Sequence, residues 1–265
     1  MKNKEYSKGV FLNIFSKNKT DWKKQINFIN SLPDVNHIEI LLEDDLSSSE
    51  IRFLKSLVKK YNVIIHGPFA HLSLISPHYE VRDLAVKIYL RTLKTAEFLG
   101  AKVVTFHVGA KLKFTPGKGL IKILIQNLRR IKDSYKGKVV FTIENLPPEE
   151  RGILKHFPCS LKDLVYIKRL IPWINFTLDI GHAFQSGENL EEILKFIKKY
   201  KNSIKDIHLH DGTLNKEAHL AIGKGDLDID AFFRSLNKIG YNNYITLETI
   251  SKEDTKNSWS KIYKL

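Results

Sequence analysis

Apolar and polar residues follow one another along this chain in a repeating order that predicts short strands separated by longer helices. Apolar runs rich in β-branched residues predict strands, and segments with apolar residues three or four positions apart predict amphipathic helices. The predicted strands are residues 10–15, 37–42, 63–66, 103–107, 139–144, 174–179, 204–209 and 244–248. The predicted helices are residues 21–30, 49–60, 78–99, 120–135, 161–170, 190–200 and 229–239, followed by a short helix near Trp259.

The strict alternation of eight strands with helices predicts the architecture. A helix between two strands carries the chain back across the sheet, so consecutive strands run parallel. Eight such units favour closure into a barrel, a fold that typically needs about 250 residues. No linker or shift in composition interrupts the 265 residues. We therefore expect an α/β protein, a single (β/α)8 TIM barrel domain over residues 1–265, with long functional loops at 146–160 and 212–228.

A histidine or carboxylate occurs at or near the predicted carboxyl end of six successive strands. These residues are His66, His107, Glu144, Asp179, His208 and Glu248. The carboxyl ends of barrel strands meet at one mouth, where the active sites of this fold lie. His182 lies three residues beyond Asp179, and Asp211, Glu217 and His219 follow the seventh strand. We expect all of these side chains to converge.

Such a convergence predicts metal binding. A lone histidine at a strand end is more often a hydrogen-bonded core residue, but several buried carboxylates in one place repel one another and are costly to desolvate. Divalent cations remove that cost, and imidazole with carboxylate suits zinc, manganese or iron. Cys159 is the only cysteine. It excludes an intramolecular disulfide and fits a reducing cytoplasm.

The charge of the chain has two interpretations. Its 43 lysines and arginines exceed its 29 acidic residues, for a net charge of +14. The excess indicates either a polyanionic partner or lysines scattered over solvated helix faces. No run of about 18 apolar residues is present, so we expect no membrane span. The polar amino-terminal segment carries no apolar signal core, which favours a cytoplasmic protein.

Seven short motifs resemble the xylose-isomerase-like barrel superfamily, and within it endonuclease IV, the family 2 apurinic/apyrimidinic endonucleases. They are IHGPF at 65–69, FHVG at 106–109, IEN at 143–145, LDIGHAF at 178–184, IHLHD at 207–211, HLAIGKG at 219–225 and LET at 247–249. The resemblance covers roughly residues 63–249, with each motif on its expected strand. Related sugar isomerases and epimerases share several of these motifs.

The resemblance implies up to three divalent metals, Zn2+ or alternatively Mn2+. The first would be held by His66, His107 and Glu144. The second would be held by Glu144 as a bridge, with Asp179, His208 and Glu248. The third would be held by His182, Glu217 and His219, although the family has Asp where Glu217 stands. The family's arginine between the last two ligands is Ala218 here, and its long DNA-recognition loop signature is missing.

Phosphodiester hydrolysis at abasic or damaged DNA is the first functional hypothesis. Clustered metals supply a hydroxide near neutral pH, and Glu144 would hold it. The side chains expected to bind nucleic acid are Phe69, Lys111, Lys113, Lys118, Arg151 and Lys224. Phe69 is equally explained as a loop packing residue. Acidic residues 43–45 after the second strand argue against a DNA backbone at that point.

Isomerisation or epimerisation of a phosphorylated sugar is the second hypothesis. One metal would polarise a carbonyl group, and Glu144 and Glu248 would be the catalytic base and acid. Glu39 would suit a sugar pocket better than a DNA groove. The extra histidines favour the hydrolase, because a one-metal isomerase does not need them. A metal-binding module without catalysis is a third alternative. No obligate protein partner is evident in the sequence.

Overall fold

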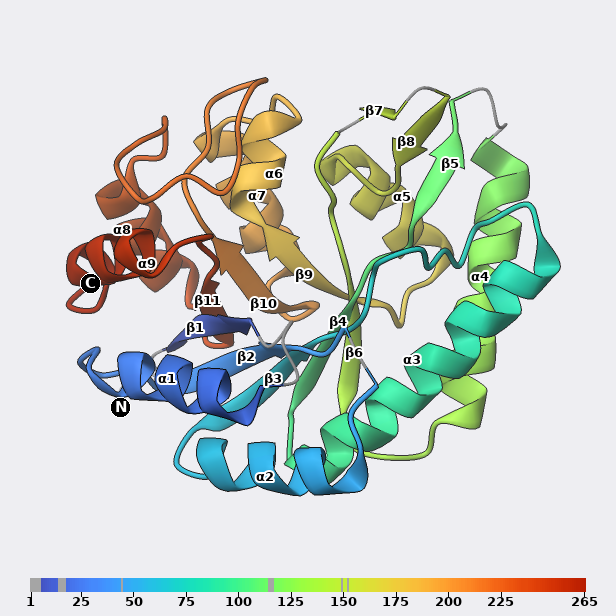
Figure 1. Ribbon diagram of the computed structural model, residues 1–265. Coiled ribbons are helices and arrows are strands. Elements are labelled where there is room, and N and C mark those ends of the chain that lie inside the picture. Colours follow the sequence, from blue (N-terminus) through green and yellow to red (C-terminus); the bar gives the residue numbers. More distant parts are fainter. Residues whose placement is uncertain (1–5, 14–17, 44, 114–116, 149, 152) are drawn as a thin grey trace.

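The computed structural model describes residues 6–13, 18–43, 45–113, 117–148, 150–151 and 153–265. Eight parallel strands form a closed barrel in the order β1-β11-β10-β9-β6-β4-β3-β2 (Figure 1), which confirms the predicted fold. Their bounds are β1 (Ser7–Asn13), β2 (His37–Leu41), β3 (Asn62–His66), β4 (Val103–Phe106), β6 (Val140–Glu144), β9 (Asn175–Asp179), β10 (Ile204–Leu209) and β11 (Tyr244–Leu247).

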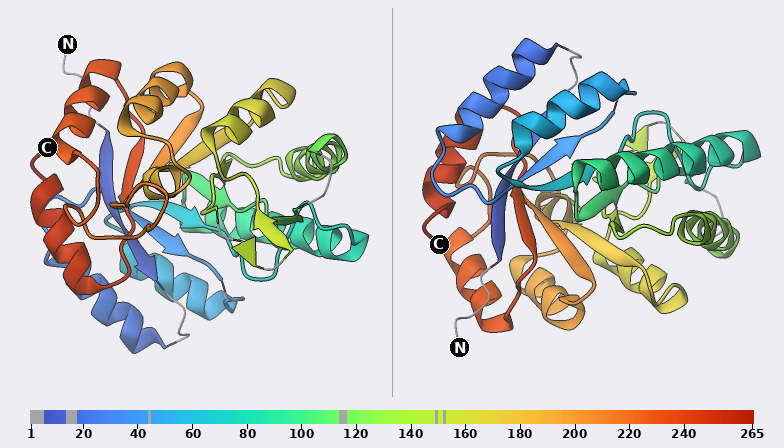
Figure 2. Two further views of the ribbon diagram at one scale, coloured as in Figure 1. Left: turned by 90° about the horizontal axis from the view of Figure 1, so that it is seen from above. Right: turned by 90° about the horizontal axis from the view of Figure 1, so that it is seen from below.

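Helices surround the barrel, as the two views along it show (Figure 2). They are α1 (Lys19–Asn30), α2 (Ser48–Val58), α3 (Tyr79–Leu99), α4 (Gly117–Ser134), α5 (Leu161–Leu170), α7 (Leu190–Tyr200), α8 (Ile229–Ile239) and α9 (Lys252–Ile262). Local signals set their ends. Ser47 and Glu50 form a capping box at the start of α2, and Gly100 ends α3 with a left-handed φ of 80°. None of the described helices combines the length and the apolar character that a membrane span requires.

Four short elements above the carboxyl end of the barrel were not predicted. The strands β5 (Ala110–Leu112), β7 (Glu150–Arg151) and β8 (Leu154–His156) form a small antiparallel sheet (Figure 1). The helix α6 (Ile180–Gln185) follows β9 directly. A strand of two or three residues or a helix of six residues is too short to show a period in hydrophobicity, so the sequence pattern could not reveal them. They shape the mouth of the barrel.

The predicted polar residues occupy matching positions at or near the carboxyl ends of their strands. His208 pairs with Asp179 on the neighbouring strand. Below these positions, the hydroxyls of Thr105, Thr142 and Thr177 hydrogen-bond one another at 2.7 and 2.8 Å. The interior therefore stays polar below the mouth, while the layer between strands and helices is apolar.

Candidate metal centre

Six barrel strands bring histidine and carboxylate side chains to the mouth. Three of these residues end their strands, one is penultimate, and two follow a strand directly: His66, Glu144 and Asp179, then His208, then His107 and Glu248. All are buried except the last two, which are partly exposed. The structure thus brings together the residues that the sequence predicts as ligands of the first and second metal ions.

The first group consists of His66, His107 and Glu144. The Nε2 atoms of the two histidines lie 3.4 and 3.1 Å from Oε2 of Glu144. The other ring nitrogen of His66, Nδ1, is 2.8 Å from the carbonyl oxygen of Gly67. If Nδ1 donates its proton there, Nε2 is left as a free electron-pair donor. Burial opposes protonation of His66, but the Glu144 carboxylate outweighs it and raises the pKa of His66 to about 9. The carboxylate therefore attracts positive charge to this point.

The second group shares Glu144 with the first. The Nδ1 atom of His208 lies 3.1 Å from Oε1 of Glu144, 3.0 Å from Oε2 of Glu248 and 3.9 Å from Oδ2 of Asp179. Glu144 thus turns one oxygen to each group. This is the arrangement that a carboxylate bridging two ions requires.

A buried pair of acids holds the opposite edge of the His208 ring. Nε2 of His208 lies 2.9 Å from Glu39 and 3.6 Å from Asp206. Burial, together with the neighbouring Glu39 carboxylate, raises the pKa of Asp206 to about 8. Asp206 therefore holds its proton to a higher pH than an ordinary carboxyl group, and Glu39 is the nearer of the two acids to His208. A carboxylate behind a ligand histidine fixes its ring and raises its basicity. Glu39 supports a ligand and does not line the cavity described below.

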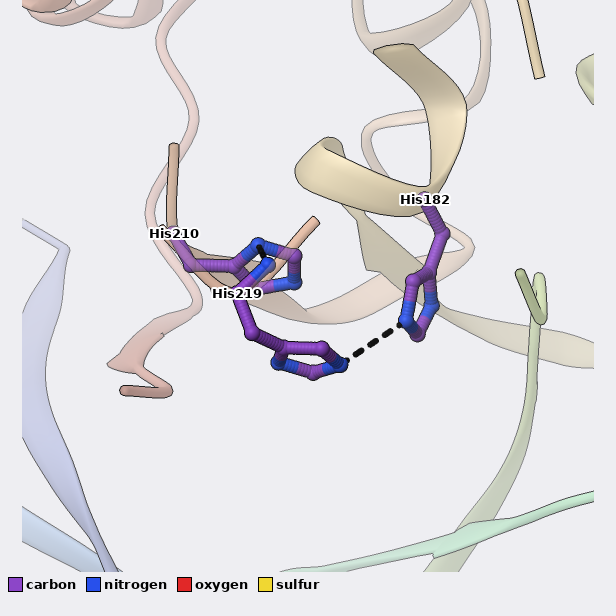
Figure 3. A group of neighbouring side chains, drawn as sticks. All are labelled: His182, His210 and His219. Carbon is purple, nitrogen blue, oxygen red and sulfur yellow. Dashed lines mark hydrogen bonds between the residues drawn. The ribbon is translucent and has the colours of Figure 1, made fainter. Parts of the chain in front are cut away.

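The third group is made of His182, His210 and His219 (Figure 3). His182 lies on α6, and its Nε2 is 3.1 Å from Nε2 of His219. His219 has a left-handed φ of 58°, and its ring stacks on that of His210 with centroids 4.1 Å apart. Glu217, expected here as a ligand, is exposed and belongs to none of the groups that the described residues form. In this structure the third residue beside His182 and His219 is His210.

Both ring nitrogens of His210 are already engaged. Nδ1 accepts the backbone N–H of His219 at 2.7 Å, and Nε2 lies 2.9 Å from Oδ2 of Asp179. Since Nδ1 accepts, Nε2 carries the proton and donates it to the carboxylate. His210 is therefore a poor ligand and a good support for two others. The sequence signal was its alternate spacing from His208, which in a strand points both side chains to the same face.

The spacing of these atoms fits divalent ions. Two ligands at about 2.1 Å from a tetrahedral zinc ion lie about 3.4 Å apart. Four ring-to-carboxylate distances in the first two groups, at 3.0 to 3.4 Å, and the 3.1 Å between His182 and His219 are close to that value, while Asp179 lies farther from His208, at 3.9 Å. Imidazole and carboxylate donors without thiolate suit zinc or manganese. The described residues can hold a cluster of ions joined by Glu144.

A cavity of about 940 Å3 opens above the metal groups. His66, His107, Glu144, His182, His219 and Glu248 form part of its wall. Of the side chains expected to bind nucleic acid, Phe69 lines the cavity, whereas Lys111, Lys113 and Lys224 do not. The side chains of Lys118 and Arg151 lie outside the part of the molecule that the structure describes. A role in nucleic-acid binding stays a prediction for this set.

Phe69 packs against the first metal group. Its ring stacks on His107 with centroids 4.9 Å apart and meets the edge of His66 at 5.6 Å. The loop is held by Glu43, whose two carboxylate oxygens accept the backbone N–H groups of Phe69 and Ala70 at 3.0 and 2.8 Å. In the sequence, Glu43 is only one of three acidic residues expected to repel a DNA backbone. In the structure it is an anchor for the loop that carries Phe69.

Comparison with known proteins gives a consistent picture of the fold. A family model described as xylose isomerase-like TIM barrel matches residues 25–264. An uncharacterised protein of Methanocaldococcus jannaschii is 30% identical over 230 residues, 80% of this chain and 73% of its own. A probable endonuclease 4 of Aquifex aeolicus is 30% identical over 186 residues, 65% of this chain and 64% of its own.

A solved structure named as epimerase-like shares the fold. A D-tagatose 3-epimerase-like protein superposes with a TM-score of 0.81 over 97% of this chain and 96% of its own, at 23% identity. At that identity the likeness concerns the fold alone. The relatives thus include proteins named for DNA cleavage and proteins named for sugar epimerisation.

Proposed function

We propose, from the premise that this chain belongs to the xylose isomerase-like TIM barrel family, that it is a metal-dependent phosphodiester hydrolase of the endonuclease IV type. The observation that carries the proposal is the two-sided Glu144 carboxylate, with Oε2 beside His66 and His107 and Oε1 beside His208. A bridging carboxylate and a further histidine pair are what a cluster of ions needs. A site for one ion needs neither.

The ions, when bound, would stabilise negative charge on phosphate oxygens and make a nucleophilic hydroxide available near neutral pH. The overall reaction adds one water: its oxygen bonds to phosphorus, the P–O bond to the leaving group breaks, and the leaving alkoxide takes up a proton from solvent. Glu248 is the most exposed carboxylate of the second group, at 17% for its side chain. We therefore assign it the removal of the water proton to solvent. The side chain of Glu144 is only 2% exposed, and we assign it no proton transfer: it stays ionised between the first and second metal groups.

Sugar epimerisation is the second candidate. The observation that favours it is that Glu144 and Glu248 both lie next to the same nitrogen of His208, at 3.1 and 3.0 Å. Two carboxylates beside one ion position could remove a proton from one face of the carbon next to a ketose carbonyl and return a proton to the opposite face of the same carbon. Exchange of substrate carbon-bound hydrogen in D2O, followed by NMR, would detect this activity and would be absent in a hydrolase.

The first test of the hydrolase is Glu144→Gln. Zinc or manganese should be found in the purified protein by elemental analysis. The variant should lose cleavage of bis(4-nitrophenyl) phosphate and of an abasic-site duplex by a factor of about 100 or more, because the charge shared by two groups is gone. Its far-ultraviolet circular dichroism should be unchanged. Full activity in exhaustively chelated wild-type protein would refute the proposal.

The second test removes the third group. His182→Ala combined with His219→Ala should lower the bound metal count by one and reduce diester cleavage by orders of magnitude. The matched control is His78→Ala, an exposed histidine at the start of α3, which should leave both quantities at the wild-type level. An unchanged metal count in the double variant would make these histidines substrate contacts.

A further inference from the structure

The wall of the cavity indicates what kind of diester the site accepts, provided that the proposed hydrolysis holds. Apart from the metal groups, most of the side chains that give the cavity its shape are apolar. They include Phe11, Phe28, Ile29, Leu41, Leu146 and Leu154. Lys252 is the one lysine or arginine among the described residues that line it. Its Nζ lies 5.7 Å from the centre of the Phe28 ring.

The mouth of this cavity is also apolar. Ile250 is 85% exposed, Leu154 is 41% exposed and Phe69 is 38% exposed, and all three line it. Exposed apolar side chains that gather around an opening mark a binding site for apolar groups. A duplex makes half or more of its hydrogen bonds through phosphates and sugars, largely to lysine and arginine. The described rim does not offer such a row of cations beside the metal groups.

The size of the cavity also indicates a small-molecule ligand. At about 940 Å3 it is within the range of about 300–1,000 Å3 that encloses small-molecule ligands. The metal groups at one side would receive the phosphate. The aromatic and aliphatic wall formed by β1, β2 and α1 would surround one of the two ester groups.

We propose that the substrate is a small phosphodiester with one apolar, preferably aromatic, ester group, which the Phe11–Leu41–Ile29 wall and the Leu154–Ile250 mouth bind. The anionic phosphate lies at the metal groups, and the apolar group occupies the rest of the cavity. Abasic duplex DNA is then a poor substrate, even though the catalytic groups resemble those of a nuclease.

The test uses two diesters with the same leaving group, phenyl 4-nitrophenyl phosphate and methyl 4-nitrophenyl phosphate. Burying the phenyl group should raise kcat/KM about tenfold or more over the methyl ester. The double variant Leu154→Lys with Ile250→Lys should reduce that ratio at least threefold. The control, Ile153→Lys with Leu170→Lys, adds the same charges at exposed apolar positions that do not line the cavity. It should keep the wild-type ratio.

Calorimetry separates a failure of this inference from a failure of the proposed function. Phenyl phosphate should bind the metal-loaded protein about tenfold more tightly than methyl phosphate, whether or not any diester is cleaved. Equal affinities would overturn the inference. The inference would also be overturned if the protein cleaved abasic duplex faster than the phenyl ester and if the Leu154→Lys, Ile250→Lys variant cleaved the duplex faster still. Absence of all diester cleavage with the affinity difference intact would refute the hydrolase and leave the apolar subsite in place.

Discussion

Glu188 is a partly buried carboxyl group whose ionisation opposes folding. Burial raises its pKa from 4.5 to about 7, and the nearby acids Glu192 and Asp163 add to the effect. Its Oε1 accepts the backbone N–H of Leu161 at 2.9 Å. Because the pKa is higher in the folded state, the favourable contribution of Glu188 is complete below pH 4.5 and is lost as the pH rises towards 7.

Glu188→Gln is therefore expected to be more stable than the wild type at pH 8. Its free energy of unfolding should also decrease less than that of the wild type between pH 4.5 and 7. Glutamine keeps an oxygen for Leu161 but has no proton to lose. Urea denaturation at pH 5 and pH 8 would measure this. The control is Glu191→Gln on the same helix terminus, where the side chain is exposed and pairs with Lys195. Identical pH profiles for Glu188→Gln and wild type would contradict the assignment.

Single residues also show where sequence reasoning succeeds and fails. Residues at strand ends could be placed from their strand alone, so His66, Glu144, Asp179 and His208 were found. Glu217 was expected beside His182, but it is exposed and His210 lies there instead, because the backbone path of the loop decides which side chains approach His182. The left-handed φ of His219 and the hydrogen bonds within the loop are tertiary outcomes that no local period encodes.

At the scale of elements, the loop 212–228 depends on one buried carboxylate, Asp211. Its oxygens accept the backbone N–H groups of Gly212 at 2.9 Å, Leu227 at 3.0 Å and Gly223 at 2.7 Å. Three donors on one charge cross-link the start and end of the loop. Asp211, which is not a member of the three metal groups, thus fixes the loop that carries His219.

Asp211→Asn is expected to lower the free energy of unfolding by about 2–3 kcal/mol, because an amide group cannot accept all three bonds. Amide hydrogen exchange should accelerate across residues 212–228 and stay unchanged in β3 and β4. The control is Asp226→Asn in the same loop, where the carboxylate accepts one exposed bond from Leu214 at 2.8 Å. If both variants exchange equally fast, Asp211 does not organise the loop.

The long elements could be predicted, whereas the short ones could not. The bounds of α5, α7 and α8 match the predicted ones, because each helix has a clear period and an N-cap residue. The bounds of β10 match as well. The β5-β8-β7 sheet forms from three- and two-residue pieces that are distant in the chain. Its formation depends on pairing between segments far apart, which a local pattern cannot report.

At the scale of the whole molecule, metal removal should cost stability. Ions that bind the folded chain and not the unfolded one stabilise it by about 2.7 kcal/mol at a hundredfold excess over Kd. For a chain of this size that corresponds to a Tm difference of roughly 5–10 °C. Thermal unfolding with saturating zinc or manganese and with chelator would measure it. Glu144→Gln should show a smaller difference. No metal-dependent change in Tm would count against a resident cluster.

The pairing of β1 with β11 has a consequence for how the protein is made. Ser7 lies beside Tyr244 in the register of these strands, so the ring of strands closes only when segments from near the two ends of the sequence meet. Translation proceeds at about 5–20 residues per second, which delays the last strand by tens of seconds. During that interval the nascent sheet would have unpaired edges on β1 and β10, and such edges pair readily with other chains. The yield of folded protein in a living cell would then depend on whether these edges are covered until the last strand has left the ribosome.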